Sequence, residues 1–376
     1  MGKRNIQINK PKLLFIVPRF HTNLYYRLKA LKGNGFELNL IALKQEHSEC
    51  HDIIKPNILD YSPIYNFLEK IRYKIFKNNP SDKWKLHYSW PSLIKFYKQI
   101  KKNNPDIIFI RGVQSFYFLI SLIISRILNK KIFVLMQVDK YYAENWKKKI
   151  SLFILKKIFK VQKIITPLKN TLNKQDSFFE YLPFIIESKN FEKKYFLNNK
   201  INILDIGKFV QRKDHLTLIK AINKLKNKYS ITLTIVGEKR DREYLNEILN
   251  YIQKNNLEKI VKIKFNLKYK EVLNIYKKFD LFVLPSYNEP AAYSILEAMV
   301  NKLPIICSDT CGTKCYIKNK ENGYIFKSKN VDDLVNKIEL IIKKKDNLMK
   351  IGRDSFELVQ KYYSPKNFIK KFKDIV

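Results

Sequence analysis

The chain has 376 residues, and 45% of them are hydrophobic, which suits two globular domains and excludes a chain too polar to fill a core. It carries 73 Lys and Arg against 34 Asp and Glu, so its formal net charge is +39. This excess indicates an anionic partner, such as nucleic acid, an anionic membrane or a phosphate-bearing substrate, although a general bias of the sequence toward Lys, Asn and Ile accounts for part of it.

We expect neither a signal peptide nor a transmembrane helix. The basic start leads into only a short apolar run before Pro18, and the apolar stretch 116–128 contains Arg126 and is shorter than the roughly 20 residues that span a bilayer. The three cysteines within 307–315 follow at every fourth position, without a Cys-x-x-Cys pair or a nearby His. This spacing predicts reduced thiols rather than a zinc site, as in a cytoplasmic protein.

Short apolar runs that are typical of strands alternate with longer amphipathic runs that are typical of helices. The expected strands are residues 12–17, 37–43, 106–110, 131–136 and 163–166 in the first half, and 201–206, 231–236, 261–265, 281–285 and 304–306 in the second. Continuous apolar strands separated by helices predict parallel sheets covered on both faces. The sequence therefore predicts an α/β protein with two doubly wound domains facing across a cleft, residues 1–183 and 201–360, joined by a linker at 184–200.

The first candidate binding residues follow the first two strands of the second half, at the ends where such sheets bind ligands. Gly207 and Lys208 come directly after the first strand, and Gly237 ends the second. Arg212 and Lys213 stand at the entrance of the intervening helix. Because glycine permits close backbone approach and cations at a helix start attract phosphate oxygens, this loop predicts a diphosphate site.

Glu289 and Glu297 stand on either side of a predicted helix start at Pro290, with seven residues between them. The backbone amides of residues 291–293 would be free there to meet an anion. Carboxylates only accept hydrogen bonds and therefore suit hydroxyl groups, which predicts a nucleotide sugar with Glu289 toward the hexose and Glu297 toward the ribose. Taken alone, two glutamates at this spacing are also typical of a solvated or helix-capping pair, and the cationic loop upstream favours the ligand.

At these residues the sequence resembles the retaining GT-B glycosyltransferases of family 4, the glycosyl transferases of group 1. The segment YNEPAAYSILEAM, residues 287–299, resembles that family's signature of two glutamates separated by seven residues. GKFVQRK, residues 207–213, is similar to the family's diphosphate loop. The resemblance covers nearly all of residues 201–376 and extends more loosely over the first half.

The resemblance implies a GT-B fold with an acceptor-binding first domain and a donor-binding second domain, both Rossmann-like, and a closing helix, 361–376, that crosses back to the first. It implies that Arg212 and Lys213 neutralise the diphosphate and form the catalytic set with Glu289. The donor would be bound by Gly207, Lys208, Gly237, Ala292, Tyr293 and Glu297. The implied reaction transfers a sugar with retention at the anomeric carbon, and the departing diphosphate helps to take the acceptor proton.

The acceptor side departs from the family pattern. His21, after the first strand, is the best acceptor-side candidate, although a loop histidine is as readily structural. Asp139 is a second candidate, or it caps the helix that follows. In the second half, Ala292 replaces a glycine of the family and Cys315 replaces a glutamate. The sequence contains no Asp-x-Asp, so no essential metal or other cofactor is expected.

Residues 144–164 alternate lysines with Ile, Leu and Phe at helical spacing, beginning near Trp146. A basic amphipathic helix with a tryptophan at its start is typical of the interface of an anionic membrane. An ordinary surface helix that packs its apolar side on a sheet has the same pattern. In the membrane interpretation the protein is peripheral on the inner face of the plasma membrane, and its acceptor is a lipid-linked saccharide.

The sequence therefore predicts a retaining glycosyltransferase that moves a sugar from a nucleotide-diphosphate sugar to a saccharide or polyprenyl-diphosphate-linked acceptor in bacterial surface polysaccharide biosynthesis. A sugar-nucleotide epimerase or a non-catalytic sugar-nucleotide-binding protein on the same fold is the alternative. A basic nucleic-acid-binding protein is less favoured, because no binding module is recognisable and the aromatic residues lie within apolar strand and helix patterns. We therefore expect no nucleic-acid partner.

Overall fold

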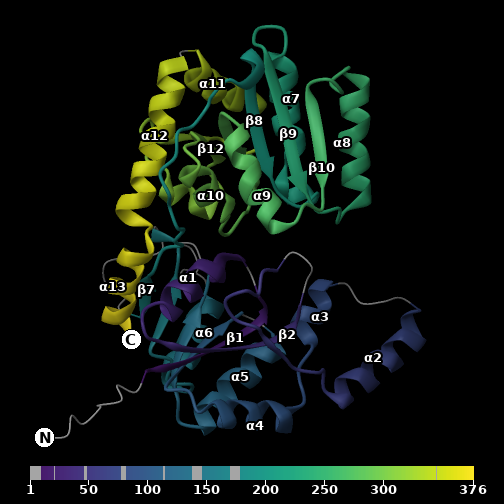
Figure 1. Cartoon of the computed structure of the whole chain (residues 1–376). Coiled ribbons are helices and arrows are strands. Elements are labelled where there is room, and N and C mark those ends of the chain that lie inside the picture. The colour runs from purple at the N-terminus through teal and green to yellow at the C-terminus, as the bar shows by residue number, and fades with distance from the viewer. Residues whose placement is uncertain are drawn as a thin grey trace, which may run out of the picture. The chain divides into compact units, whose positions relative to one another are not determined.

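A computed structural model describes the chain in two compact units (Figure 1). The described residues are 10–20, 22–45, 49–77, 82–112, 115–137, 146–169, 178–343 and 345–376. The first unit comprises the residues up to Leu182 together with Ile369–Val376, and the second comprises Pro183–Phe368.

The first unit contains, within its described residues, a seven-stranded parallel sheet in the order β3-β2-β1-β4-β5-β6-β7. Its strands are β1 (Lys12–Arg19), β2 (Glu37–Lys44), β3 (Asn57–Ile58), β4 (Ile107–Arg111), β5 (Lys131–Leu135), β6 (Lys163–Thr166) and β7 (Phe179–Tyr181). Its helices are α1 (Thr22–Lys32), α2 (Pro63–Phe76), α3 (Asp82–Tyr88), α4 (Leu93–Asn103), α5 (Phe116–Ile127) and α6 (Trp146–Lys157). The five predicted strands are confirmed, whereas β3 and β7 are too short to leave an apolar run in the sequence.

Alternate residues of the first sheet fill two different layers. On one face, Phe15, Phe109 and Phe133 stand in register on β1, β4 and β5, and their rings stack with centroids 4.9 and 5.4 Å apart. On the other face, α4 and α5 bury their apolar sides, and Phe96 of α4 stacks on Tyr117 of α5. Because both faces are covered, the interior residues of the central strands are apolar and charged residues occur only at the strand ends, which explains the continuous runs in the sequence.

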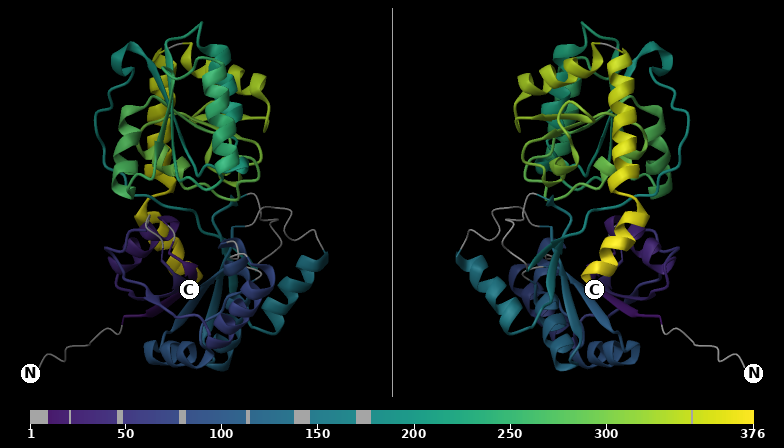
Figure 2. Two further views of the ribbon diagram at one scale, coloured as in Figure 1. Left: turned by 90° about the vertical axis from the view of Figure 1, so that its right-hand side faces the viewer. Right: turned by 90° about the vertical axis from the view of Figure 1, so that its left-hand side faces the viewer.

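The second unit contains, within its described residues, a six-stranded parallel sheet in the order β10-β9-β8-β11-β12-β13. Its strands are β8 (Ile201–Ile206), β9 (Ile231–Gly237), β10 (Val261–Phe265), β11 (Leu281–Leu284), β12 (Ile305–Ser308) and β13 (Gly323–Phe326). Its helices are α7 (His215–Leu225), α8 (Arg242–Lys254), α9 (Tyr269–Ile275), α10 (Ser294–Val300), α11 (Val331–Ile342), α12 (Lys345–Tyr362) and the start of α13 (Pro365–Ile375). The predicted doubly wound sheet is confirmed, with helices on both faces (Figure 2).

Strand order in the second sheet reverses between β8 and β11, which lie side by side although they are separated along the chain. In sheets of this kind the loops at such a point part from each other and leave room for a ligand at the carboxyl ends of the strands. The candidate residues Gly207 to Lys213 follow β8, and Glu289 follows β11. The fold therefore brings both predicted motifs to the same edge.

The segment 184–200, predicted to be a linker, runs along the second unit. The backbone amide of Phe196 donates to Asp280 Oδ1 over 2.8 Å, and the hydroxyl of Tyr195 donates to the carbonyl oxygen of Lys302 over 2.8 Å. At the end of the chain, α13 belongs to the first unit from Ile369 onward, where Phe372 packs edge-on against Phe36.

Candidate functional site

The loops after β8 and β9 are held together by two glycines. A Cβ atom added to Gly237 would lie 1.9 Å from the carbonyl oxygen of Gly207, so a larger residue there would push the two strand ends apart. Phe209 reinforces this approach, because its amide donates to the carbonyl oxygen of Glu238 over 2.9 Å. The two glycines therefore allow close contact between the two strand ends, and their predicted role in the approach to a diphosphate stays a prediction.

Arg212 and Lys213 lie in a single 3-10 turn, Gln211–Lys213, which precedes α7. The turn ends at Asp214, whose φ of 52° places it in the left-handed region and redirects the chain into the helix. The amide of Tyr287 donates to the carbonyl oxygen of Arg212 over 2.9 Å. This bond ties the loop after β8 to the loop after β11 and positions both cations beside Glu289.

Arg212, Lys213 and Glu289 form one ion cluster. Lys213 Nζ lies 2.6 Å from Glu289 Oε2, and Arg212 Nη1 donates to the same oxygen. Lys213 is only 11% exposed at its side chain, whereas Arg212 is 46% exposed. Two cations and one carboxylate leave a net charge of about +1, so the cluster attracts an anion.

The two cations also set the protonation of Glu289. Burial by itself would raise the pKa of this carboxyl group, but the charges of Lys213 and Arg212 outweigh burial and hold the pKa below its ordinary value. Glu289 is therefore ionised at neutral pH and can only accept hydrogen bonds. Such a carboxylate suits a hydroxyl group of a sugar.

Glu297 lies on α10 and is almost completely buried. Its Oε2 accepts a hydrogen bond of 2.7 Å from the hydroxyl of Tyr276, and its Oε1 accepts one of 3.2 Å from Tyr269. Burial raises the pKa of Glu297, and the two tyrosine hydroxyls offset part of that rise. Sequence reasoning missed these two tyrosines, because they come from a different segment and carry no motif of their own.

The predicted helix start at Pro290 is wrong, because α10 begins at Ser294 and Glu297 is in its first turn. The amide of Ala292 is not free to meet an anion as predicted, since it donates to Thr313 Oγ1 over 3.2 Å. Tyr293 directly precedes the helix, and its hydroxyl donates to the carbonyl oxygen of Ile185. The chain between Glu289 and Ser294 is thus held by side chains outside the motif.

Lys208 and a buried histidine complete the loop. Lys208 Nζ lies 3.2 Å from the carboxylate of Glu238. Behind it, His215 Nδ1 lies 2.6 Å from Asp205 Oδ2, both side chains being fully buried, and His215 Nε2 lies 3.2 Å from the carbonyl oxygen of Lys208. Sequence reasoning missed this pair, although an aspartate at the end of an apolar strand is a visible signal. The pair fixes the backbone from which Lys208 projects.

The remaining predictions concern the acceptor-side residues, the cysteines, metal sites and membrane-spanning helices. His21 and Asp139 lie outside the described residues. None of the four cysteines takes part in a disulfide bond. Within the described ranges, no group of His, Cys, Asp and Glu is arranged to hold a metal ion. Of the helices that the structure describes, none combines the length and apolar character needed to cross a bilayer.

Comparison with known proteins identifies a family match and several relatives. Residues 187–357 match the family model described as glycosyl transferases group 1. The protein CapJ of Staphylococcus aureus is 34% identical over 146 residues, which are 38% of this chain and 36% of CapJ. A UDP-Gal:alpha-D-GlcNAc-diphosphoundecaprenol alpha-1,3-galactosyltransferase of Escherichia coli is 36% identical over 104 residues, 27% of this chain and 25% of that protein. The chain thus matches about a third and a quarter of the length of these two curated relatives.

Solved structures resemble the whole chain. A glycosyltransferase from Rickettsia africae ESF-5 has a TM-score of 0.71 at 18% identity, with 98% of both chains covered. Anabaena Alr3699/HepE in complex with UDP-glucose has a TM-score of 0.73 at 13% identity, covering 96% of this chain and 98% of that one. At such identities the likeness concerns the fold alone, and it confirms the predicted GT-B fold.

Proposed function

Because residues 187–357 belong to the glycosyl transferases group 1 family, we propose that the protein transfers a sugar from a nucleotide-diphosphate sugar to a saccharide or lipid-linked saccharide, with retention at the anomeric carbon. The observation that carries this proposal is the cluster of Arg212, Lys213 and Glu289 at the carboxyl edge of the second sheet. A diphosphate is bound by cations and the hydroxyl groups of a sugar by hydrogen-bond acceptors. This cluster supplies two cations and one carboxylate acceptor in direct contact.

In this reaction Arg212 and Lys213 stabilise the charge that develops on the leaving diphosphate. The bond between the anomeric carbon and the diphosphate oxygen breaks, and a bond to the acceptor oxygen forms on the same face. The acceptor proton passes to an oxygen of the departing diphosphate. Because the two cations are already held together by Glu289, they need little reorganisation when negative charge appears, which is the main source of rate enhancement at such sites.

Glu289 and Glu297 bind the two rings of the donor in this proposal. Glu289, ionised and anchored by Lys213, accepts a hydroxyl of the transferred sugar. Glu297 accepts a ribose hydroxyl at Oε1, the oxygen that receives the longer hydrogen bond and faces the partly exposed Tyr269. The diphosphate is proposed to bind beside Gly207, Lys208 and Gly237. The backbone contacts between the loops after β8 and β9 hold these residues in place.

The transfer is also proposed to need no metal ion or other cofactor. The support is chemical, because two fixed cations supply the positive charge that a divalent metal supplies to a diphosphate elsewhere. The sequence, moreover, has no Asp-x-Asp pair to carry such an ion.

The acceptor is proposed to be a polyprenyl-diphosphate-linked saccharide used in bacterial surface polysaccharide synthesis. The printed names of two relatives support this class. The Escherichia coli relative is named for a diphosphoundecaprenol-linked GlcNAc acceptor, and a Campylobacter jejuni relative, 30% identical over 92 residues, is named for a diphospho-undecaprenol-linked N,N'-diacetylbacillosamine. A lipid-linked acceptor of this kind must be reached at a membrane surface.

A peripheral position on the inner face of the plasma membrane is supported by exposed apolar side chains among lysines. In 146–163 there are seven lysines and no acidic residue, and Trp146, Phe153 and Ile158 are exposed there. The predicted helix 144–164 is shorter than expected, since α6 ends at Lys157.

A second exposed apolar surface, which sequence reasoning missed, runs along α2. Its exposed side chains follow at helical spacing and are those of Ile64, Phe67, Leu68, Ile71 and Ile75; this surface is the apolar ridge of α2. Exposed apolar side chains among lysines suit the interface of an anionic membrane. They do not favour nucleic acid, because the chain has no recognisable nucleic-acid-binding module.

The decisive experiment combines donor binding with transfer. Thermal shift with UDP, GDP and ADP sugars identifies the donor, and the labelled donor is then incubated with bacterial lipid extract in the presence of EDTA. Labelled lipid with the anomeric configuration of the donor is the expected product. Epimerised donor without transfer would support the alternative, a sugar-nucleotide epimerase. Activity that disappears in EDTA and returns with Mg²⁺ would contradict the metal-free proposal alone.

A further inference from the structure

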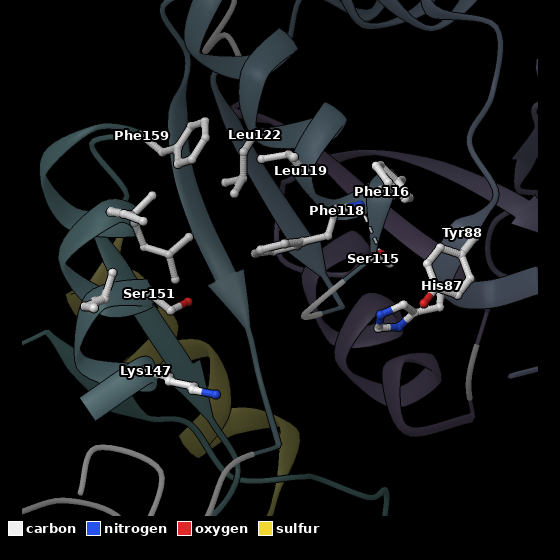
Figure 3. Close-up of a pocket in the computed structure, with 13 residues that line it drawn as sticks. His87, Tyr88, Ser115, Phe116, Phe118, Leu119, Leu122, Lys147, Ser151 and Phe159 are labelled. Carbon is white, nitrogen blue, oxygen red and sulfur yellow. Dashed lines mark hydrogen bonds between the residues drawn. The ribbon is translucent and has the colours of Figure 1, made fainter. Parts of the chain in front are cut away.

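The first unit contains an apolar cavity between α5 and α6 (Figure 3). Its volume is about 560 Å³, within the range of ~300–1,000 Å³ that is typical of small-molecule sites. Phe116, Leu119 and Leu122 line it from α5, and Ile150, Ile154 and Leu155 line it from α6. Three of these side chains, those of Phe116, Leu119 and Ile150, remain exposed. An apolar cavity with an exposed rim is a place where a hydrocarbon ligand gains free energy by leaving water.

The cavity has a polar end and an apolar end. Ser115 and Lys147 stand at the starts of α5 and α6, the helix ends that adjoin the carboxyl edge of the sheet, and His87 lies at the end of α3. Leu122 and Phe159 lie at the opposite end of the cavity, away from that edge (Figure 3). A ligand that matches this gradient has a charged head near the carboxyl edge and a hydrocarbon tail directed along the two helices.

The first turn of α6 brings positive charge to the polar end. Lys147 lines the cavity itself, and Lys148 and Lys149 follow it in the first turn of α6. No acidic side chain occurs between residues 146 and 163. The head group of the ligand is therefore anionic, and a phosphate or diphosphate is the anion that a lysine binds as a point charge.

We propose that this cavity binds the isoprenoid chain of a lipid diphosphate, with the diphosphate at Lys147 and the first isoprene units between α5 and α6. The inference rests on the proposed function, since it locates the lipid part of the acceptor on the first unit. A single chain suits a cavity of this volume better than a two-chain phospholipid, which would leave one acyl chain in water. The branched aliphatic and aromatic lining also matches the methyl-branched, unsaturated chain of an isoprenoid.

The test uses geranylgeranyl diphosphate as a probe, added to the full chain below its critical micelle concentration, with binding followed by tryptophan fluorescence. Leu119→Glu is compared with Ile123→Glu, because both residues lie on α5 with side chains 43% and 41% exposed, but only Leu119 lines the cavity. We expect Leu119→Glu to weaken probe binding at least tenfold and Ile123→Glu to change it less than twofold. Equal losses in both variants would overturn the cavity and leave only a general apolar surface.

Two further measurements test the diphosphate head group and the hydrocarbon chain of the probe separately. Lys147→Gln should weaken binding of geranylgeranyl diphosphate about tenfold but leave binding of geranylgeraniol, which has no diphosphate, unchanged. n-Hexadecyl diphosphate, which keeps the head group but has a straight saturated chain, should bind at least tenfold more weakly than the probe, and equal binding would overturn the isoprenoid assignment. Donor binding is measured separately by thermal shift with nucleotide sugars. Binding of the probe without binding of any nucleotide sugar would contradict the proposed function but not the proposal that the cavity binds an isoprenoid diphosphate.

Discussion

Lys213 Nζ lies 2.6 Å from Glu289 Oε2, although the two residues are 76 positions apart in the chain. One follows β8 and the other follows β11, the two strands at which the order of the second sheet reverses. Their contact turns two separate sequence motifs into one charged cluster at the edge where such sheets bind ligands.

Removing the Lys213 ammonium should impair the chemical step more than donor binding. Lys213→Ala is expected to lower kcat about 10²–10³-fold, the size of effect seen when one fixed charge-stabilising group is lost, and to raise the donor KM only a few-fold. The measurement is steady-state kinetics with saturating acceptor. Lys224→Ala, which removes an exposed lysine paired with Asp332 on the same unit, is the control and should leave both constants unchanged. Unchanged turnover in Lys213→Ala would remove that residue from the mechanism.

The cluster of Arg212, Lys213 and Glu289 should make the free energy of unfolding depend on pH in the acidic range. The folded-state pKa of Glu289 is lowered from 4.5, so its ion pairs stabilise the fold above that pH and this contribution is lost as pH falls through the lower folded value. Glu289→Gln is therefore expected to cost about 1–3 kcal/mol near pH 7 and to cost progressively less below about pH 4.5. Urea unfolding of both proteins across this range measures the difference. A difference that grows as pH falls would contradict the assigned ion pairs. The control is Glu321→Gln at the exposed pair with Lys318, which should change stability little at any pH in this range.

Glu297 is expected to act on the ribose of the donor. Glu297→Gln should raise the donor KM about tenfold or more with a smaller change in kcat, because it replaces one of the two carboxyl oxygens with an amide group that cannot accept a ribose hydroxyl in ground-state binding. A donor lacking both ribose hydroxyls should bind wild-type protein about as weakly. If the variant loses a further tenfold with that donor, the carboxylate and the hydroxyls do not interact, and the ribose assignment fails.

Gly237 is expected to tolerate no side chain. Gly237→Ala puts a methyl group 1.9 Å from the carbonyl oxygen of Gly207, so the strand ends must separate at a cost of about 1–3 kcal/mol. We expect a lower Tm in differential scanning fluorimetry and weaker donor binding. Gly33→Ala is the matched control, since its added Cβ would lie 3.5 Å from its nearest neighbour. An unchanged Tm in Gly237→Ala would mean that the two loops can separate freely.

The apolar ridge of α2 should contribute to membrane binding. Phe67→Glu is expected to reduce flotation with anionic vesicles at least fivefold, because it places a negative charge where an exposed ring would enter the interface. Added salt should weaken binding of the wild-type protein through screening of its lysines. Leu340→Glu, at an exposed leucine on α11 of the second unit, is the control. Wild-type protein that floats with neither neutral nor anionic vesicles would end the peripheral-membrane proposal.

The strands were predictable because each is buried on both faces, and burial of that kind leaves a continuous apolar run whatever its partners are. All ten expected strands occur, and β8, for example, spans the predicted residues 201–206. Helix ends were less predictable. Pro290 is a good first residue for a helix, yet α10 begins at Ser294, because the chain before it is held by the bond from the Ala292 amide to Thr313. Such a bond depends on a segment 21 residues away and leaves no local signal.

The sequence by itself determined the alternation of strands and helices, the parallel sheets, and the kinds of charged group that follow β8 and β11, since these depend on the periodicity and chemistry of neighbouring residues. Only the tertiary structure decided that Arg212 and Lys213 both bind Glu289, that Glu297 is held by Tyr269 and Tyr276, and that α5 and α6 enclose a cavity. The physical reason is that a charge or an apolar face can satisfy itself with any of several partners, and the choice is made by which loops and helices the sheet brings within a few ångströms of each other.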